Sequence, residues 1–382
     1  MDIENTPAGQ VLKIPTGYRA FVPNPLPPKI EWTKNLVNTL SKADHILGKL
    51  SRESSYLPNP HLLIRPFVTR EAVLSSRIEG TQATVGEILA NEAGAMTKHS
   101  REDLQEVNNY IKALDYGIKR LGELPLSLRL IRELHEKLMQ GVRGEHATPG
   151  EFRNTQNWIG IPGCTLATAK YIPPPPDKLM QCMSSLESYL HDRELPALIH
   201  IALCHYQFEA IHPFLDGNGR VGRLLITLLL IDQQLLSSPL LYLSAFFEAT
   251  RADYYQNLYS VSAVGGWCDW LVYFLNGVVV QATDALSRAE RINHLLTTWK
   301  VKAGGKSSSL VRNIIEDLAV NPFVTIKNII LRFSVAFTTA QRAIQKLESL
   351  EILSNMGEKK RDRIYCATPI LDILEEPTKI SS

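Results

Sequence analysis

The stretch HPFLDGNGRVGR, from His212 to Arg223, decides the class of this chain. Within it, GNGRVG matches the G-x-G-x-x-G pattern of dinucleotide-binding turns. Such a turn needs a buried β-strand before its first glycine and alternating strands and helices around it. Residues 198–208 instead repeat apolar side chains at spacings of three and four, which is a helical period. We therefore expect the loop between two helices, which disfavours a nicotinamide site.

The same loop has the composition of an anion-binding site. Gly217 and Gly219 permit positive φ angles, so successive backbone N–H groups can converge on one point. A helix expected from about Arg220 would direct its positive N-terminus at that point. Arg220 and Arg223 are three residues apart and can face the same ligand. Two arginines beside a backbone nest favour a di- or triphosphate over a single carboxylate.

Two further residues add chemistry to this phosphate site. Asp216 would be repelled by a polyphosphate unless a cation bridged them, so it is a candidate Mg²⁺ ligand. His212 can accept a proton from an incoming hydroxyl. Phe214 is expected to anchor the loop in the core. The base, the metal ligand and the anion-binding site together predict phosphoryl or nucleotidyl transfer. The simpler alternative is a helix-capping histidine with arginines in surface ion pairs. His200 and His205, on the preceding apolar helix, are expected to be core residues.

The composition restricts the classes of protein to which the chain can belong. The chain has 382 residues, 45% of them hydrophobic, and a net charge of +2, which argues against a whole-chain electrostatic nucleic-acid binder. Five scattered cysteines without a C-x-x-C pair argue against a disulfide framework or a zinc site. The N-terminus lacks the apolar region of a signal peptide, and the longest apolar run, residues 224–231, is too short to cross a bilayer. We expect a cytoplasmic protein without a membrane partner.

The chain is expected to be mainly α-helical, with local exceptions. Residues 1–30 are rich in proline and indicate an extended arm. Residues 149–176 alternate β-formers with turn residues, which predicts a short hairpin and then a polyproline stretch. Residues 301–309 have the composition of a linker. Beyond them, three short helices and a two-stranded wing with a charged tip suggest a winged helix-turn-helix.

The loop HPFLDGNGRVGR matches in full the Fic signature H-P-F-x-[DE]-G-N-G-R-x-x-R. PGEFRNTQNWIG and TAKYIPPPP resemble the segments on either side of the family's flap, and SAFFEATRADYYQNL resembles the border of its nucleotide pocket. The resemblance covers about residues 30–290, and bacterial Fic proteins also carry winged-helix tails. It implies a bacterial protein with a Fic-type helical core, a small β-hairpin flap and a winged helix-turn-helix domain. We divide the chain into three parts. Residues 1–110 form the N-terminal arm and helices, residues 111–295 the Fic core, and residues 300–382 the winged-helix domain.

The resemblance implies transfer of AMP from ATP to Ser, Thr or Tyr hydroxyls of target proteins, including the chain itself. His212 would be the general base and Asp216 would hold Mg²⁺. The nucleotide would be bound by Gly217, Asn218, Gly219, Arg220, Val221, Gly222, Arg223 and Thr250. The family often has Asn-Arg where this chain has Thr250-Arg251, which alters a contact on the adenosine side. A flap at residues 160–171 would pair with the target's backbone as an added strand.

SSRIEG, from Ser75 to Gly80, is a second unusual stretch. A helix is expected over residues 68–81, starting near Thr69, which places Ser75 and Glu79 on one face. Glu79 at the C-terminus of that helix opposes the macrodipole. By spacing alone it is a solvated glutamate. The stretch also resembles the Fic inhibitory helix [ST]-x-x-x-E-[GN], which implies that Glu79 pairs with Arg223 and leaves ATP misaligned.

Several alternatives stay open at this point. Within the enzyme class they are removal of AMP, with Glu79 aligning a water, and transfer of another nucleotide. Outside it, the chain is a DNA-binding regulator acting through residues 300–382. Arg342 and Lys346 share a face of the expected recognition helix, although glutamates offset part of that charge. A homodimer through the N-terminal arm or the core helices is compatible with the sequence.

Overall fold

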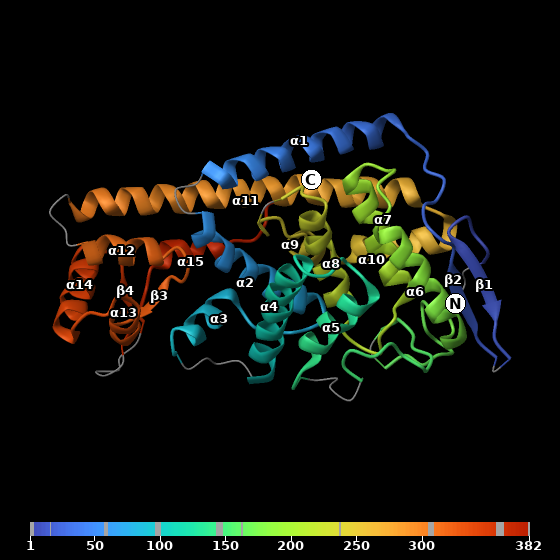
Figure 1. Cartoon of the computed structure of the whole chain (residues 1–382), viewed down its shortest axis with the longest axis horizontal. Coiled ribbons are helices and arrows are strands. Elements are labelled where there is room, and N and C mark those ends of the chain that lie inside the picture. The colour runs from blue at the N-terminus through green and yellow to red at the C-terminus, as the bar shows by residue number, and fades with distance from the viewer. Residues whose placement is uncertain are drawn as a thin grey trace.

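The computed structural model describes residues 4–15, 17–56, 60–95, 101–142, 148–161, 163–236, 238–304, 309–356 and 363–380. The chain is mainly helical, as the sequence predicts. The long helix α11 (Trp267–Ala303) runs along most of the molecule, and α1 (Lys34–Tyr56) packs against part of its length (Figure 1). The other elements lie below them. They are β1 (Gly9–Lys13), β2 (Arg19–Pro23), α2 (Pro60–Ile78), α3 (Val85–Glu92), α4 (Arg101–Leu121), α5 (Leu128–Met139), α6 (Pro176–Leu190), α7 (Ala197–Ile211), α8 (Asn218–Asp232), α9 (Ser244–Ala249) and α10 (Arg251–Val264).

Helices α7 and α8 form the centre of the core and position the loop between them. Nearly every residue of α7 is buried, because the helix is apolar on all sides and packs against α6, α8, α10 and α11. In α8, the run LLITLLL is buried as well. The signature loop therefore joins two rigid, fully enclosed helices.

The small β-structure differs from what the sequence predicts. The N-terminal segment expected as an extended arm contains the antiparallel β1–β2 hairpin, whose Phe21 is fully buried. The hairpin expected within residues 149–176 is reduced to one bridge between Ile159 and Tyr171. The N–H of Phe21 donates to the carbonyl of Ile172, so β2 lies alongside this segment. The β-formers of the flap therefore pair partly with the N-terminus rather than only with each other.

The C-terminal region contains α12 (Ser309–Asp317), β3 (Phe323–Thr325), α13 (Ile326–Phe333), α14 (Phe337–Ser349), β4 (Ser354–Asn355), β5 (Ile364–Cys366) and α15 (Thr368–Glu375). The strands form an antiparallel sheet in the order β3-β5-β4. The predicted linker is shorter than expected, because α11 continues to Ala303, and residues 305–308 lie outside the described part of the chain. The charged tip expected for a wing falls mostly on residues 357–362, which also lie outside it.

Two simpler expectations concern cysteines and membrane spans. All five cysteines are free thiols. In the described ranges, none of the helices combines the length and the apolar character that a bilayer crossing needs.

Candidate active site

The glycines of the signature loop serve different purposes. Gly217 adopts φ 75°, the left-handed conformation that the sequence predicts, and α8 begins at the next residue rather than near Arg220. The prediction of a positive φ at Gly219 is wrong, because this residue lies within the helix. Its lack of a side chain provides space instead. A Cβ there would lie 2.3 Å from Glu79 Oε1 and 2.9 Å from Arg223 Nη1.

The N-terminus of α8 offers backbone donors for an anion. The N–H of Val221 bonds to the carbonyl of Gly217 at 3.1 Å, so the three N–H groups before it precede the helix's own hydrogen-bond ladder. The side chain of Asn218 accepts from the N–H of Phe214 and donates to its carbonyl, both at 2.8 Å. In this structure Asn218 thus braces the loop with its side chain and contributes only its backbone to the anion site.

Asp216 is placed where a hydrated cation could reach it. Its side chain is 52% exposed, and Oδ1 accepts from the N–H of Gly217 at 2.6 Å. The described residues contain no cluster of three ligating side chains, but Mg²⁺ at phosphate sites often needs only one carboxylate beside the substrate's oxygens. The site therefore fits Mg²⁺ bound with a nucleotide. Arg220, which is buried, lies 3.5 Å from Glu106 and 3.9 Å from Asp216.

His212 ends α7 in a left-handed conformation, with φ 49° and ψ 62°. Its Nδ1 lies 3.4 Å from the carbonyl of Glu209, which places the ring proton on Nδ1 and leaves Nε2 as the acceptor. Burial and then the charge of Arg153 lower the pKa of His212 to about 4, although the Glu209 carbonyl and Glu79 act in the opposite direction. At neutral pH the ring is therefore unprotonated and able to take a proton.

Two residues that the sequence did not identify hold the carbonyl of His212. Arg153 Nε donates to it at 2.9 Å, and Asn157 Nδ2 donates to it at 3.2 Å. Asn157 also donates to the carbonyl of Phe214 at 2.8 Å. Both belong to PGEFRNTQNWIG, where polar residues among β-formers were the available signal, but the resemblance placed that stretch in the segment before the flap.

A third unpredicted residue, His135 of α5, supports the loop from another side. Its Nδ1 accepts from the N–H of Gly150 at 2.9 Å, so its Nε2 donates to the carbonyl of Asp216 at 3.1 Å. The ring stacks on Phe214 with centroids 3.7 Å apart, which confirms that Phe214 anchors the loop in the core. Burial lowers the pKa of His135 to about 4, so it stays neutral.

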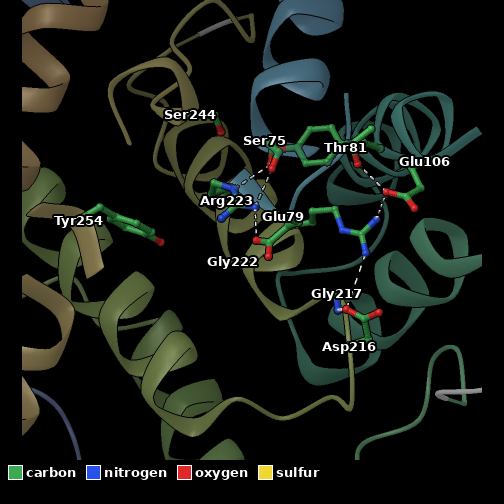
Figure 2. Close-up of polar contacts among 12 residues, drawn as sticks. Ser75, Glu79, Thr81, Glu106, Asp216, Gly217, Gly222, Arg223, Ser244 and Tyr254 are labelled. Carbon is green, nitrogen blue, oxygen red and sulfur yellow. Dashed lines mark hydrogen bonds and ion pairs between the residues drawn. The ribbon is translucent and has the colours of Figure 1, made fainter. Parts of the chain in front are cut away.

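Glu79 and Arg223 form the ion pair that the resemblance implies (Figure 2). Arg223 Nη2 donates to Glu79 Oε1 at 2.7 Å and to the carbonyl of Ser75 at 3.0 Å, while Nε donates to Ser75 Oγ at 2.8 Å. The Arg223 side chain is 2% exposed and that of Glu79 is 34% exposed. Burial alone would raise the pKa of Glu79, but the charge and hydrogen bond of Arg223 outweigh it and keep it below its usual value.

Helix α2, which carries Ser75 and ends just before Glu79, is longer than predicted. It begins at Pro60 instead of near Thr69. Its buried Glu71 accepts hydrogen bonds from Tyr110 and Ser244, which fixes the helix against α4 and α9. Burial raises the pKa of Glu71, despite these hydrogen bonds and the charge of Arg223.

Val221 and Gly222, which the resemblance places at the nucleotide, have packing partners in this structure. The Val221 side chain is fully buried. A Cβ at Gly222 would lie 2.2 Å from Glu209 Oε1, an oxygen that is buried without a hydrogen bond. Burial, with Arg223 opposing it and Glu79 adding to it, raises the pKa of Glu209 to about 7.

The remaining predicted residues lie around this centre. Thr250 joins α9 to α10, and its Oγ1 lies 2.7 Å from the hydroxyl of Tyr273. His200 and His205 are buried, as the sequence predicts. His205 bonds to the carbonyl of Gly222 at 3.1 Å and to the Tyr254 hydroxyl at 2.8 Å, so it also supports the start of α8.

Comparisons with known proteins agree with this geometry. A model of the Fic/DOC family N-terminal region matches residues 37–119, and a model of the Fic/DOC family matches residues 125–230. Proteins named protein adenylyltransferase Fic from Drosophila grimshawi and Drosophila melanogaster are each 33% identical over 132 residues. That stretch is 32% of this chain and 25% of each relative, so the chain spans about a quarter of the relatives it matches.

Solved structures share the fold. A Fic family protein from Desulfovibrio desulfuricans G20 has a TM-score of 0.60 at 20% identity, covering 90% of this chain and 98% of its own. A Fic domain-containing signalling protein from Bacteroides thetaiotaomicron has a TM-score of 0.52 at 21% identity, covering 68% and 97%. The helical core, the signature loop and the two family matches lead to one conclusion: residues 37–230 of this chain carry the N-terminal and Fic domains of the Fic/DOC family.

Proposed function

We propose that this chain transfers AMP from ATP to hydroxyl groups of target proteins and of itself. The observation that carries the proposal is the unprotonated ring of His212 beside the N-terminus of α8 and the exposed carboxylate of Asp216. An acceptor for a proton, donors for phosphate oxygens and a carboxylate for a cation are the parts that nucleotidyl transfer requires. The names of the Drosophila relatives agree with this class.

The residues suggest the order of events. The target's hydroxyl gives its proton to Nε2 of His212, and its oxygen attacks the α-phosphorus. The bond from that phosphorus to the bridging oxygen breaks, and pyrophosphate leaves. The N–H groups at the start of α8 would hold phosphate oxygens, and Asp216 would hold Mg²⁺, which neutralises phosphate charge when bound. The target would be held by the flap, where Ile161 is 79% exposed.

We further propose that Glu79 keeps the enzyme inactive. A nucleotide whose terminal phosphate needs Arg223 competes with a carboxylate that already occupies its Nη2. Breaking a buried ion pair is costly unless a new anion replaces the old one. Bound ATP would therefore lack its arginine or lie misplaced for attack until Glu79 moves away.

Glu79→Gly tests both proposals. We expect it to raise AMP transfer, including self-modification, at least tenfold, because Arg223 then becomes free for phosphate. The measurement is incorporation of label from α-labelled ATP, with Glu194→Gly, in an exposed loop, as the matched control. Adding His212→Ala to Glu79→Gly should abolish transfer, while calorimetry should still detect binding of ATP. No gain in Glu79→Gly would sink the inhibitory role, and loss of ATP binding in the double variant would make His212 a binding residue.

The same protein separates the alternatives within the enzyme class. Labelled GTP, UTP and CTP beside ATP, each with a lysate, identify the nucleotide that is transferred. If Glu79 instead aligned a water for removal of AMP, the wild type would release AMP from a modified protein and Glu79→Gly would not.

We also propose a second function for the C-terminal region, as a winged helix-turn-helix that binds DNA. The exposed positions of α14 include Thr338, Thr339, Arg342, Gln345 and Lys346, while Glu348 of the same helix is half-buried. Such a face suits a phosphate backbone, whose binding weakens as salt rises. In a gel shift with the full chain at moderate salt, Arg342→Ala with Lys346→Ala should weaken binding, whereas Lys34→Ala with Lys42→Ala on exposed positions of α1 should not. Absence of any shift would exclude DNA.

A further inference from the structure

Arg153 is a buried cation without an acidic partner. Its side chain is 3% exposed, and none of the described residues forms an ion pair with it. Its donors all go to backbone carbonyls, at His212, Thr155, Pro174 and Ile211. Burial lowers the pKa of Arg153 itself to about 10. A guanidinium in such a place is costly to the fold, which calls for a role other than stability.

The contacts of Arg153 gather on the backbone around His212. Its side chain reaches the carbonyl of His212 at 2.9 Å, and its own N–H donates to the carbonyl of Pro213 at 2.9 Å. His212 is in a left-handed conformation that non-glycine residues avoid. The hydrogen bonds to these two carbonyls hold the turn, and with it the direction in which the imidazole points.

We propose that Arg153 is a positioning residue for His212: it fixes the turn that aims the imidazole and places a fixed positive charge against the backbone of that turn. The inference rests on the proposed role of His212 as a base. Arg153 is too buried to touch either substrate, so it acts only through His212.

The charges that surround His212 show why the fixed cation matters. Burial is the largest influence on its pKa and Arg153 the next, both lowering it. Glu79, across the site, and the carbonyl of Glu209, one turn earlier on α7, raise it. When Glu79 leaves, a negative charge is lost and Arg153 remains. The pKa of His212 in the active state is therefore no higher than in the inhibited state, so the base stays unprotonated.

The experiment uses Arg153→Met in the Glu79→Gly background, with Asn157→Ala as the matched control. Asn157 also donates to the carbonyl of His212 but carries no charge. Both variants should lower kcat for transfer at least tenfold with KM for ATP within twofold. Only Arg153→Met should also move the acid limb of the kcat profile upward, by about one pH unit. Arg153→Lys, which keeps the charge, should lower kcat without moving the limb.

Two outcomes would overturn the proposal. One is an unchanged kcat in Arg153→Met; the other is an acid limb that moves equally in Arg153→Met and Asn157→Ala. If Arg153→Met does not fold, Arg153→Lys tests the proposal instead. An acid limb of its kcat–pH profile that moves to higher pH would contradict the role of the charge. Titration of the His212 imidazole by NMR in wild type and Arg153→Lys tests that role without any transfer. Inactivity of Glu79→Gly itself would instead count against the proposed function.

Discussion

Ser75 does as much to hold Arg223 as Glu79 does. Its Oγ accepts from Nε, and its carbonyl accepts from the same Nη2 that donates to Glu79. These two contacts orient the guanidinium so that Nη2 faces the carboxylate. The serine four residues before the glutamate is thus part of the contact with Arg223 to which we attribute inhibition.

Ser75→Ala should therefore raise basal transfer, because Nε of a buried arginine loses its partner while Glu79 remains. One hydrogen bond to a charged group contributes about 1.5 kcal/mol at the low end of its usual range, which corresponds to roughly tenfold. Label incorporation from ATP measures it, and Ser75→Ala in the Glu79→Gly background should add nothing. Ser76→Ala is the control, since that hydroxyl is buried without a hydrogen-bond partner. Equal effects of the two alanines would contradict the role of Ser75.

At this scale the sequence shows the residues to which we assign the chemistry more directly than the residues that support them. His212, Asp216 and Arg223 lie in one local motif, and their proposed roles rest on its spacing. Arg153 and His135 reach the loop from segments far from it in the chain, and no local period connects them to it. The sequence predicted a positive φ at Gly219, where the structure requires only space, because a glycine in a pattern does not distinguish these two needs.

Helix α2 connects the contact between Ser75 and Arg223 with the C-terminal region of the chain. Arg70 Nη2 donates to Thr378 Oγ1 at 2.9 Å, and Glu375 Oε1 accepts from the N–H of Gly86 at 2.8 Å, so α15 and the tail are bound to α2 and α3. The helix begins at Pro60, before the start near Thr69 that the sequence predicts, although it contains Pro66 and a proline inside a helix usually breaks it. Packing of α2 against α4 and α9 outweighs that local preference.

Loosening α15 should weaken the hold of Glu79 through α2. Ile370 is fully buried, and Ile370→Ala should lower the free energy of unfolding by about 3 kcal/mol. We expect it also to raise basal transfer severalfold, and not to do so when Glu79 is already glycine. Thermal denaturation and label incorporation measure the two effects, with Asp372→Ala on the exposed face of α15 as the control. Lower stability with unchanged transfer would show that α15 does not bear on Glu79.

Across the whole molecule, histidines whose pKa is lowered by burial, His200 among them, make the fold sensitive to acid. Burial is the main cause that lowers the pKa of His205 to about 3, and of His135 and His212 to about 4. In the unfolded chain these rings bind protons below about pH 6.5, whereas in the folded chain they do not. Stability is therefore complete above pH 6.5 and is lost as the pH falls. Glu209, with its raised pKa, acts oppositely between about pH 7 and its unfolded value.

His205→Gln removes one of the histidines that make the free energy of unfolding depend on pH. Between pH 6.5 and 5 the wild type should lose about 2 kcal/mol more unfolding free energy than this variant. Urea denaturation at the two pH values measures the difference, and His294→Gln, at an exposed position of α11, is the control. The same pH dependence in wild type and His205→Gln would contradict the assignment.

The number of residues in the long helix α11 is fixed by the contacts that it makes at separate points along its length. Trp270 donates to the carbonyl of Ala202 in α7, and Arg288 donates to the carbonyls of Ile373 and Glu376 beside α15. These two residues are eighteen positions apart (288 minus 270), or five turns at 3.6 residues per turn, so they emerge in phase. One inserted residue would rotate everything beyond it by about 100° and turn Arg288 away from the C-terminal helix. An insertion or deletion between these two contacts keeps both of them only when it changes the length of α11 by nearly whole turns.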